Sequence, residues 1–253
     1  MAEPRRQAFL DANVLRGHLQ TDVLLTLADN GAFEPKWSAE VLDEVRRNRP
    51  ERLTEQAIDR RLNQMNRAFP KAMVRDYEDL MPEMRADAKD KHVLAAAVRS
   101  KSTVLVTENV KDFDPPTTGE HAMPVQKTSQ FLNQLADDDP QQVVDSMREM
   151  IGRTDREPNT LPALIDKMAG QHDLKGFAHK LNSIVPAEER GTHPNLQSIQ
   201  AAKVALDGVA ATRAASKPAA APETRKSPAP VPLQRAPRPV RRTGSEPPTL
   251  GTG

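Results

Sequence analysis

The sequence predicts an α/β fold with a central, mainly parallel sheet, followed by a small helical extension and a tail. Short apolar runs alternate with segments of helical periodicity up to about residue 136. From residue 140 the pattern is only helical, and residues 216–253 are rich in Pro, Ala and Arg, with nine prolines. We therefore expect a first domain over 6–136, a helical extension over 140–185 and a largely disordered basic tail over 186–253.

The individual elements follow from the spacing of apolar residues and from capping signals. We expect strands at 7–10, 33–37, 71–74 and 103–107, with an edge strand at 123–126. In the first domain we expect helices at 15–28, 38–48, 90–98 and 129–136, and an arginine-rich helical hairpin over 46–67. Asn30-Gly31 is a typical end for the first of these helices. Three short amphipathic helices, at 141–151, 161–169 and 174–184, are expected to form the extension.

The composition excludes several classes of protein. The 253 residues include no cysteine, which removes disulfides, zinc–thiolate sites and thiol nucleophiles and fits a reducing, cytoplasmic location. The N-terminus has no apolar signal-peptide core, and no apolar run approaches the roughly 20 residues that cross a bilayer. Aromatic residues make up only 3% of the chain, which disfavours base stacking as a means of binding nucleic acid.

The charges are unevenly distributed along the chain. Residues 184–253 hold ten Lys/Arg and five Asp/Glu, which leaves 26 basic and 30 acidic residues before them. A nucleic acid would therefore have to be held by local basic patches on an acidic domain. Arg46, Arg47 and Arg49 are candidate phosphate contacts, although a solvated helical face explains the same arginines.

Four acids occupy positions that bring side chains together in a parallel α/β domain. Asp11 ends the first strand, Glu44 borders the apolar stripe of its helix, Asp90 begins a helix, and Asp112 follows the strand at 103–107 with Glu108 and Asn109. Oxygen ligands of this kind suit Mg²⁺. Two carboxylates ~4 Å apart repel by roughly 4 kcal/mol at an effective dielectric near 20, so such a cleft needs a cation or a shared proton.

Other interpretations apply to the same residues. Most of the 35 acids are expected on the solvated surface, and Asp87 is expected to be a helix N-cap. Ser38 and Thr107 have no paired base, so nucleophilic catalysis is unsupported. A phosphoacceptor domain is disfavoured because Asp11 is the single acid at the end of the first strand. Dinucleotide binding is disfavoured because neither G-x-G-x-x-G nor a P-loop is present.

Four segments in this order, FLDANVL, SAEVLDEV, DAKDKHVLAAAV and VLVTENVKDF, resemble the PIN-domain nucleases, especially the VapC-type toxin ribonucleases. The resemblance covers about Ala8 to Leu135. The segment NTLPALIDKMAG and the helix after it also resemble the C-terminal extension of one PIN subgroup, which carries the resemblance to about Leu181. It implies a three-layer α/β/α fold, a Mg²⁺ or Mn²⁺ site and cleavage of RNA. It also implies a cognate antitoxin and, often, a homodimer.

Carried over by position, the resemblance places the first three catalytic, metal-binding acids on Asp11, Glu44 and Asp90. Many relatives have the fourth acid where this sequence has Asn109, and Asp112 is expected to replace it, which leaves the number of ions open. The groups expected to orient these acids are Asn13, Thr107 and Asn109. We predict a Mg²⁺-dependent endoribonuclease, the toxin of a type II toxin–antitoxin system. The alternative is a PIN-like module that binds RNA or protein without cleaving, which the Asn109 departure favours.

Overall fold

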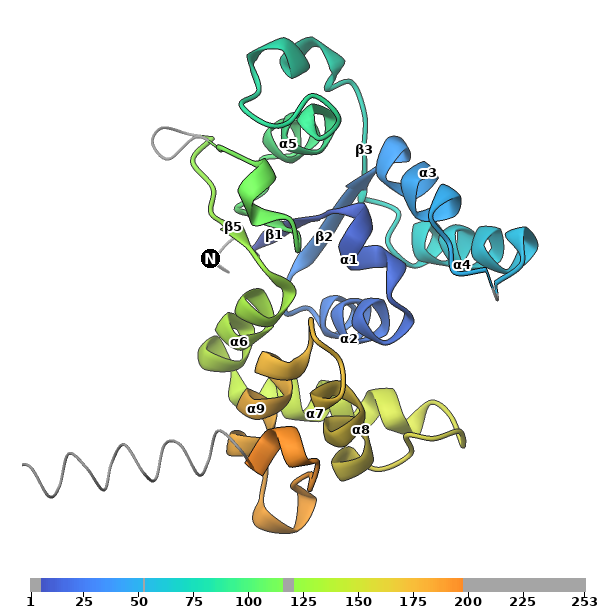
Figure 1. Ribbon diagram of the computed structural model, residues 1–253, viewed down its shortest axis with the longest axis vertical. Coiled ribbons are helices and arrows are strands. Elements are labelled where there is room, and N and C mark those ends of the chain that lie inside the picture. The colour runs from blue at the N-terminus through green and yellow to red at the C-terminus, as the bar shows by residue number, and fades with distance from the viewer. Residues whose placement is uncertain (1–5, 52, 116–120, 198–253) are drawn as a thin grey trace, which may run out of the picture. The chain divides into compact units, whose positions relative to one another are not determined.

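The structure is a computed structural model and describes residues 6–51, 53–115 and 121–197 (Figure 1). Its sheet has five strands in the order β3-β2-β1-β4-β5, and all four pairings are parallel. The strands are β1 (Gln7–Leu10), β2 (Glu34–Ser38), β3 (Met73–Val74), β4 (Val104–Val106) and β5 (Val125–Gln126). The tail prediction for 198–253 lies outside the described residues.

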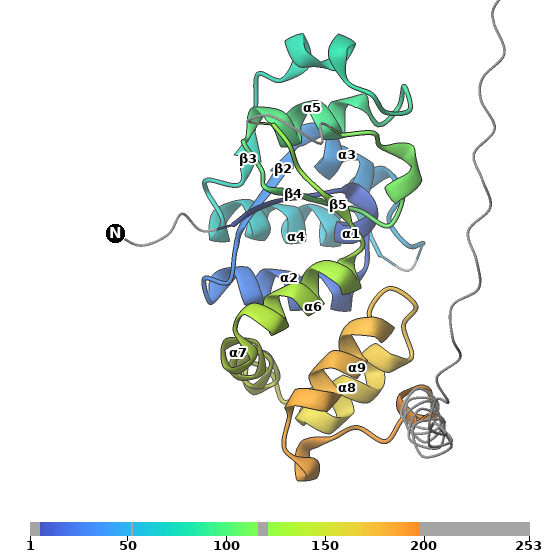
Figure 2. The same cartoon turned by 90° about the vertical axis from the view of Figure 1, so that its left-hand side faces the viewer.

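Helices on both faces of the sheet give the three-layer α/β/α fold that the sequence predicts. Helix α5 (Lys91–Arg99) covers one face, whereas α2 (His18–Asp29) and α6 (Thr128–Asp138) lie on the other side (Figures 1 and 2). The central strands are therefore buried on both faces, and Ala8, Phe9 and Leu10 are fully buried. The edge-to-face contact of Phe33 and Phe131, with ring centroids 4.9 Å apart, packs α6 against the start of β2.

The helix expected at 15–28 is divided in the structure. Helix α1 (Ala12–Arg16) begins at the end of β1, and α2 follows after Gly17, whose backbone is extended with φ −73° and ψ 125°. The Gly17 carbonyl does not continue α1; it accepts bonds from the Thr21 backbone N–H at 3.0 Å and the Thr21 hydroxyl at 2.8 Å. Helix α1 therefore starts directly after its N-cap Asp11, three residues earlier than the apolar spacing indicates.

Two further helices follow β2 in the chain. Helix α3 (Ala39–Arg47) begins at Ser38, whose hydroxyl accepts a bond from the Val41 N–H at 3.2 Å. Helix α4 (Glu55–Ala68) begins at Thr54 in the same way, so the arginine-rich segment consists of the end of α3, a connection and α4. Short 3₁₀ segments at Glu78–Glu83 (η1) and Val110–Asp112 (η2) flank α5 in the chain.

The extension contains α7 (Pro140–Gly152), α8 (Leu161–Ala169) and α9 (Lys175–Ile184), close to the three expected helices. The chain does not leave this unit at 185, because residues 186–197, including η3 (Ala187–Glu189), pack on α8 and α9. Leu196 is buried there, the Gly191 N–H donates to Asn182 Oδ1 at 2.8 Å, and the His193 N–H donates to Asp166 Oδ1 at 2.8 Å. Within the described ranges, none of the helices is both long and apolar enough to span a membrane.

Candidate metal centre

Asp11 lies at the carboxyl end of the central strand and is almost fully buried, with 5% of its surface exposed. Its Oδ1 accepts a bond from the Ala12 N–H at 2.6 Å, and its Oδ2 accepts one from the Thr107 hydroxyl at 2.7 Å. The strand register produces this pair, because Leu10 is opposite Val106 and the Asp11 N–H donates to the Val106 carbonyl at 3.1 Å. Asp11 is therefore held in one orientation at the start of α1.

Asn13 and Thr107 both contact Asp11 through their side chains. The Asn13 amide donates to Asp11 Oδ2 at 2.8 Å and to Thr107 Oγ1 at 3.0 Å, and its Oδ1 accepts a bond from the Glu108 N–H at 3.1 Å. Asn109 takes part through its backbone N–H, which donates to Thr107 Oγ1 at 3.1 Å. The Asn109 residue is exposed, so its side chain lies outside this network.

Glu44 and Asp90 approach Asp11 from two helices. Half-buried Glu44 projects from α3, and Asp90 occupies the N-cap position of α5 without a side-chain capping bond. Burial raises the pKa of Asp11, the bonds from Thr107 and Ala12 oppose this, and the charges of Glu44 and Asp90 raise it further. Burial also raises the pKa of Asp90, and the charges of Asp112 and Glu44 act in the same direction, against Lys89. Like charges thus meet from four separate elements.

A close group of three carboxylates in the described chain includes Asp87, which the sequence pattern assigned to a helix cap. Asp87, Asp90 and Asp112 each offer an oxygen, and these oxygens lie within 4.8 Å of one another. Asp87 does not cap α5, since Asp90 has the N-cap position; instead its N–H donates to the Asp112 carbonyl at 3.0 Å. In the sequence, the three-residue spacing of Asp87 and Asp90 was the signal that could have placed Asp87 with the other acids. Asp11 and Glu44 are outside this close trio.

The trio has the properties of a site for a hard divalent cation. All its donor atoms are carboxylate oxygens. Asp90 Oδ2 is buried and has no hydrogen-bond partner among the described residues, which is costly for a charged oxygen unless a cation compensates it. The only cationic group within ion-pair distance of the trio, among the described residues, is the Lys89 ammonium, 3.6 Å from Asp90 Oδ2 and 3.8 Å from Asp112 Oδ2. These residues fit Mg²⁺ or Mn²⁺.

Glu108 follows β4, as Asp112 does, but its side chain does not face the acids. Its Oε1 accepts bonds from the Thr128 N–H at 3.2 Å and from the Gln20 side chain at 3.4 Å. Thr128 is the first residue of α6, so Glu108 stabilises the start of that helix.

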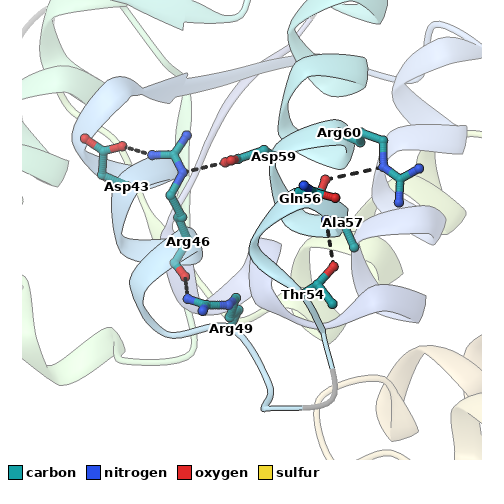
Figure 3. A network of polar contacts seen from close by, with 8 residues as sticks. All are labelled: Asp43, Arg46, Arg49, Thr54, Gln56, Ala57, Asp59 and Arg60. Carbon is teal, nitrogen blue, oxygen red and sulfur yellow. Dashed lines mark hydrogen bonds and ion pairs between the residues drawn. The ribbon is translucent and has the colours of Figure 1, made fainter.

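The three candidate phosphate contacts have different surroundings, and Figure 3 shows those of Arg46 and Arg49. Arg46 donates to Asp59 on α4 at 2.7 Å and forms a close ion pair with Asp43, so its guanidinium ties α3 to α4. Arg49 donates to the Arg46 carbonyl at 3.4 Å. Arg47 is exposed, and no described residue forms an ion pair with it. Of the three, Arg47 is the one whose charge is most available to a ligand.

A separate cavity of about 930 Å³ lies between α2, α4 and the α7–α8 segment. Its lining includes Asp22 and Arg61 but none of the predicted acids. Burial raises the pKa of Asp22, against the nearby charges of His18, Arg61 and Lys167. Arg61 donates to the Leu15 carbonyl at 3.1 Å and the Gly17 carbonyl at 3.4 Å, which explains how α4 holds the break between α1 and α2.

Comparisons with known proteins agree with the α/β/α fold. Residues 7–111 match the PIN domain, and residues 129–183 match the VapC50 C-terminal domain. Residues 7–111 are thus similar to PIN domains, and residues 129–183 are similar to the C-terminal domain of VapC50. It is 30% identical over 111 residues to the candidate ribonuclease VapC50 of Mycobacterium tuberculosis (strain ATCC 25618 / H37Rv), which covers 44% of this chain and 64% of that protein, just under two thirds of its length. No solved structure matched the chain.

Proposed function

We propose that this protein is a metal-dependent endoribonuclease and the toxin component of a type II toxin–antitoxin system. Two observations carry the proposal: Asp90 and Asp112 offer carboxylate oxygens within 4.8 Å of each other, and, in addition to burial, the charge of Glu44 raises the pKa of both Asp90 and Asp11. The VapC-type domain arrangement supports the same activity. RNA as substrate, an antitoxin as partner, a homodimer and a cytoplasmic location are parts of this proposal.

Asp90, Asp112, Asp11 and Glu44 would hold Mg²⁺ or Mn²⁺, with Asp87 as an additional carboxylate. Such an ion, when bound, supplies an activated water and neutralises charge on a phosphodiester. Thr107, Asn13 and the Ala12 N–H keep the Asp11 carboxylate oriented, and burial keeps bulk water from it. Asp90 Oδ2 has no internal donor and is therefore available as an acceptor in the centre. Arg47 would contact the RNA backbone outside the cleaved bond.

The direct test measures cleavage of labelled RNA by the purified full chain while Mg²⁺ is titrated. Asp11→Asn and Asp90→Asn should each lower the cleavage rate by at least about 100-fold, since each removes a ligand charge from the centre. Asp155→Asn, the same change in the exposed α7–α8 loop, is the matched control. Circular dichroism should show that all variants are folded. Wild-type cleavage by both Asp11→Asn and Asp90→Asn would exclude the assignment.

A second function, binding of RNA or protein without cleavage, is favoured by one observation. Asn109 stands where the resemblance to PIN-domain nucleases implies an acid, and its exposed side chain takes no part in the Asp11 network. In that case RNA binding would be independent of metal, and no RNA would be cleaved at any Mg²⁺ concentration. Asp11→Asn would then leave RNA binding unchanged.

A further inference from the structure

Lys89 is the cation built into the acidic trio. It lies in the turn between Asp87 and Asp90, which the hydrogen bond from the Asp90 N–H to the Asp87 carbonyl closes at 2.8 Å. This turn carries the ammonium to 3.6 Å from Asp90 Oδ2 and 3.8 Å from Asp112 Oδ2. Both distances exceed those of a hydrogen bond but are within ion-pair range. Lys89 thus bridges two chain segments through charge alone.

Asp90 is the residue whose charge most needs this bridge. Its side chain is 14% exposed, and its Oδ2 has no hydrogen-bond partner among the described residues. The Lys89 side chain is 68% exposed, so it can leave the trio without breaking any packing. A largely exposed ammonium can be displaced by a second cation from a buried carboxylate oxygen that accepts no hydrogen bond.

We propose that Lys89 is a resident counter-cation that competes with the divalent metal for Asp90 and Asp112 and thereby sets the metal affinity of the centre. The inference rests on the metal site of the proposed function and adds a residue that acts through the ligands. Without metal, Lys89 reduces the repulsion between the two carboxylates and keeps η2 beside the α5 N-terminus. A bound divalent ion would repel the ammonium from the same oxygens.

The test is the affinity of the full-length protein for Mn²⁺, measured by isothermal titration calorimetry without RNA. Lys89→Met should bind Mn²⁺ about three- to tenfold more tightly than wild type, because the metal no longer displaces two solvent-exposed ion pairs. Lys89→Arg keeps the charge and should bind like wild type. The matched control is Lys111→Met, which removes the same charge from an exposed neighbour of Asp112 that forms no described ion pair.

A second measurement separates this role from a general effect on folding. In chelator, Lys89→Met should melt at a lower temperature than wild type, and saturating Mn²⁺ should raise its melting temperature more than that of wild type. If wild type binds Mn²⁺ and Lys89→Met binds it equally or more weakly, the proposed competition between Lys89 and the metal is wrong. The proposed nuclease function would be unaffected by that result. Absence of Mn²⁺ binding by wild type would overturn both this inference and the metal site.

Discussion

The Thr107 hydroxyl donates a 2.7 Å hydrogen bond to Asp11 Oδ2, joining residues 96 positions apart at the ends of adjacent strands. Both side chains are buried, and the same hydroxyl oxygen accepts bonds from Asn13 and from the Asn109 N–H. One threonine therefore orders a carboxylate, an amide and the loop after β4. The donated bond also lowers the pKa of Asp11 against the effect of burial.

Thr107→Val should impair cleavage and shift its pH dependence. Loss of the hydroxyl raises the pKa of Asp11 further, so the acidic limb of the pH–rate profile should move to higher pH. The rate at neutral pH should fall by about 10- to 100-fold, as is typical when a group that orients a metal ligand is removed. Thr103→Val, whose exposed hydroxyl bonds only the Gln7 carbonyl at 3.0 Å, is the control. Identical profiles for the two variants would contradict the role of Thr107.

Asp90→Asn should stabilise the metal-free protein at neutral pH. The pKa of Asp90 in the folded protein lies above its ordinary value of 3.8. At pH values between 3.8 and this raised pKa, the folded wild type binds more protons than the unfolded chain. The wild type therefore gains stability as the pH falls through this window. The variant lacks this titration, so its advantage should shrink toward pH 4. We expect an increase in melting temperature of about 1–3 °C at pH 7.5 in chelator, measured by calorimetry at both pH values. A variant less stable than wild type at pH 7.5 would refute this.

Asp87→Asn should weaken Mn²⁺ binding by about three- to tenfold, because it removes one of three converging carboxylate charges. Asp114→Asn provides the matched control, since Asp114 is in the same loop as Asp112 but pairs with Arg85 at 3.8 Å. Isothermal titration calorimetry with Mn²⁺ measures the affinity of both variants. If Asp114→Asn weakens binding as much as Asp87→Asn, the effect is general electrostatics and not ligation.

Arg46→Ala and Arg47→Ala remove the same charge from α3 but should act differently. Arg46 ties α3 to Asp59, so its loss should lower kcat by moving Glu44 and should cost up to about 1 kcal/mol of stability. Arg47→Ala should preserve stability and weaken RNA binding, reducing its salt slope by about 0.7 if one phosphate contact is lost. Denaturation and salt-dependent RNA binding distinguish the two. The reverse pattern would assign the phosphate contact to Arg46.

Gly191→Ala should destabilise the segment that follows α9. A Cβ at Gly191 would lie 2.4 Å from Asp166 Oδ1 and 2.8 Å from Ile165 Cγ2, so we expect a loss of about 1–3 kcal/mol. Gly152→Ala is the control, because a Cβ there has nothing within 4 Å and α7 should gain up to about 1 kcal/mol. Urea denaturation measures both changes. Equal stability of the two variants would show that residues 186–197 do not depend on this packing.

Much of the fold was readable from local patterns. The strand at 7–10 and the helix beginning after Ser38 are defined by apolar spacing and a capping hydroxyl, both properties of a few neighbouring residues. The same patterns failed at Gly17, where the break depends on contacts from Thr21 and from Arg61 on α4. The placement of Asp11 beside Thr107 was predictable because parallel strands end at one edge of the sheet.

The sequence by itself determined the α/β class, the order of the elements and the positions of acids at strand and helix ends, because these depend on short-range periodicity. Only the tertiary structure decided which acids meet. It brings Asp87 to Asp112, turns Glu108 toward α6 and engages Arg46 with Asp59. Those choices depend on loop paths and on distances of a few ångströms between distant segments, and local propensity does not encode such distances.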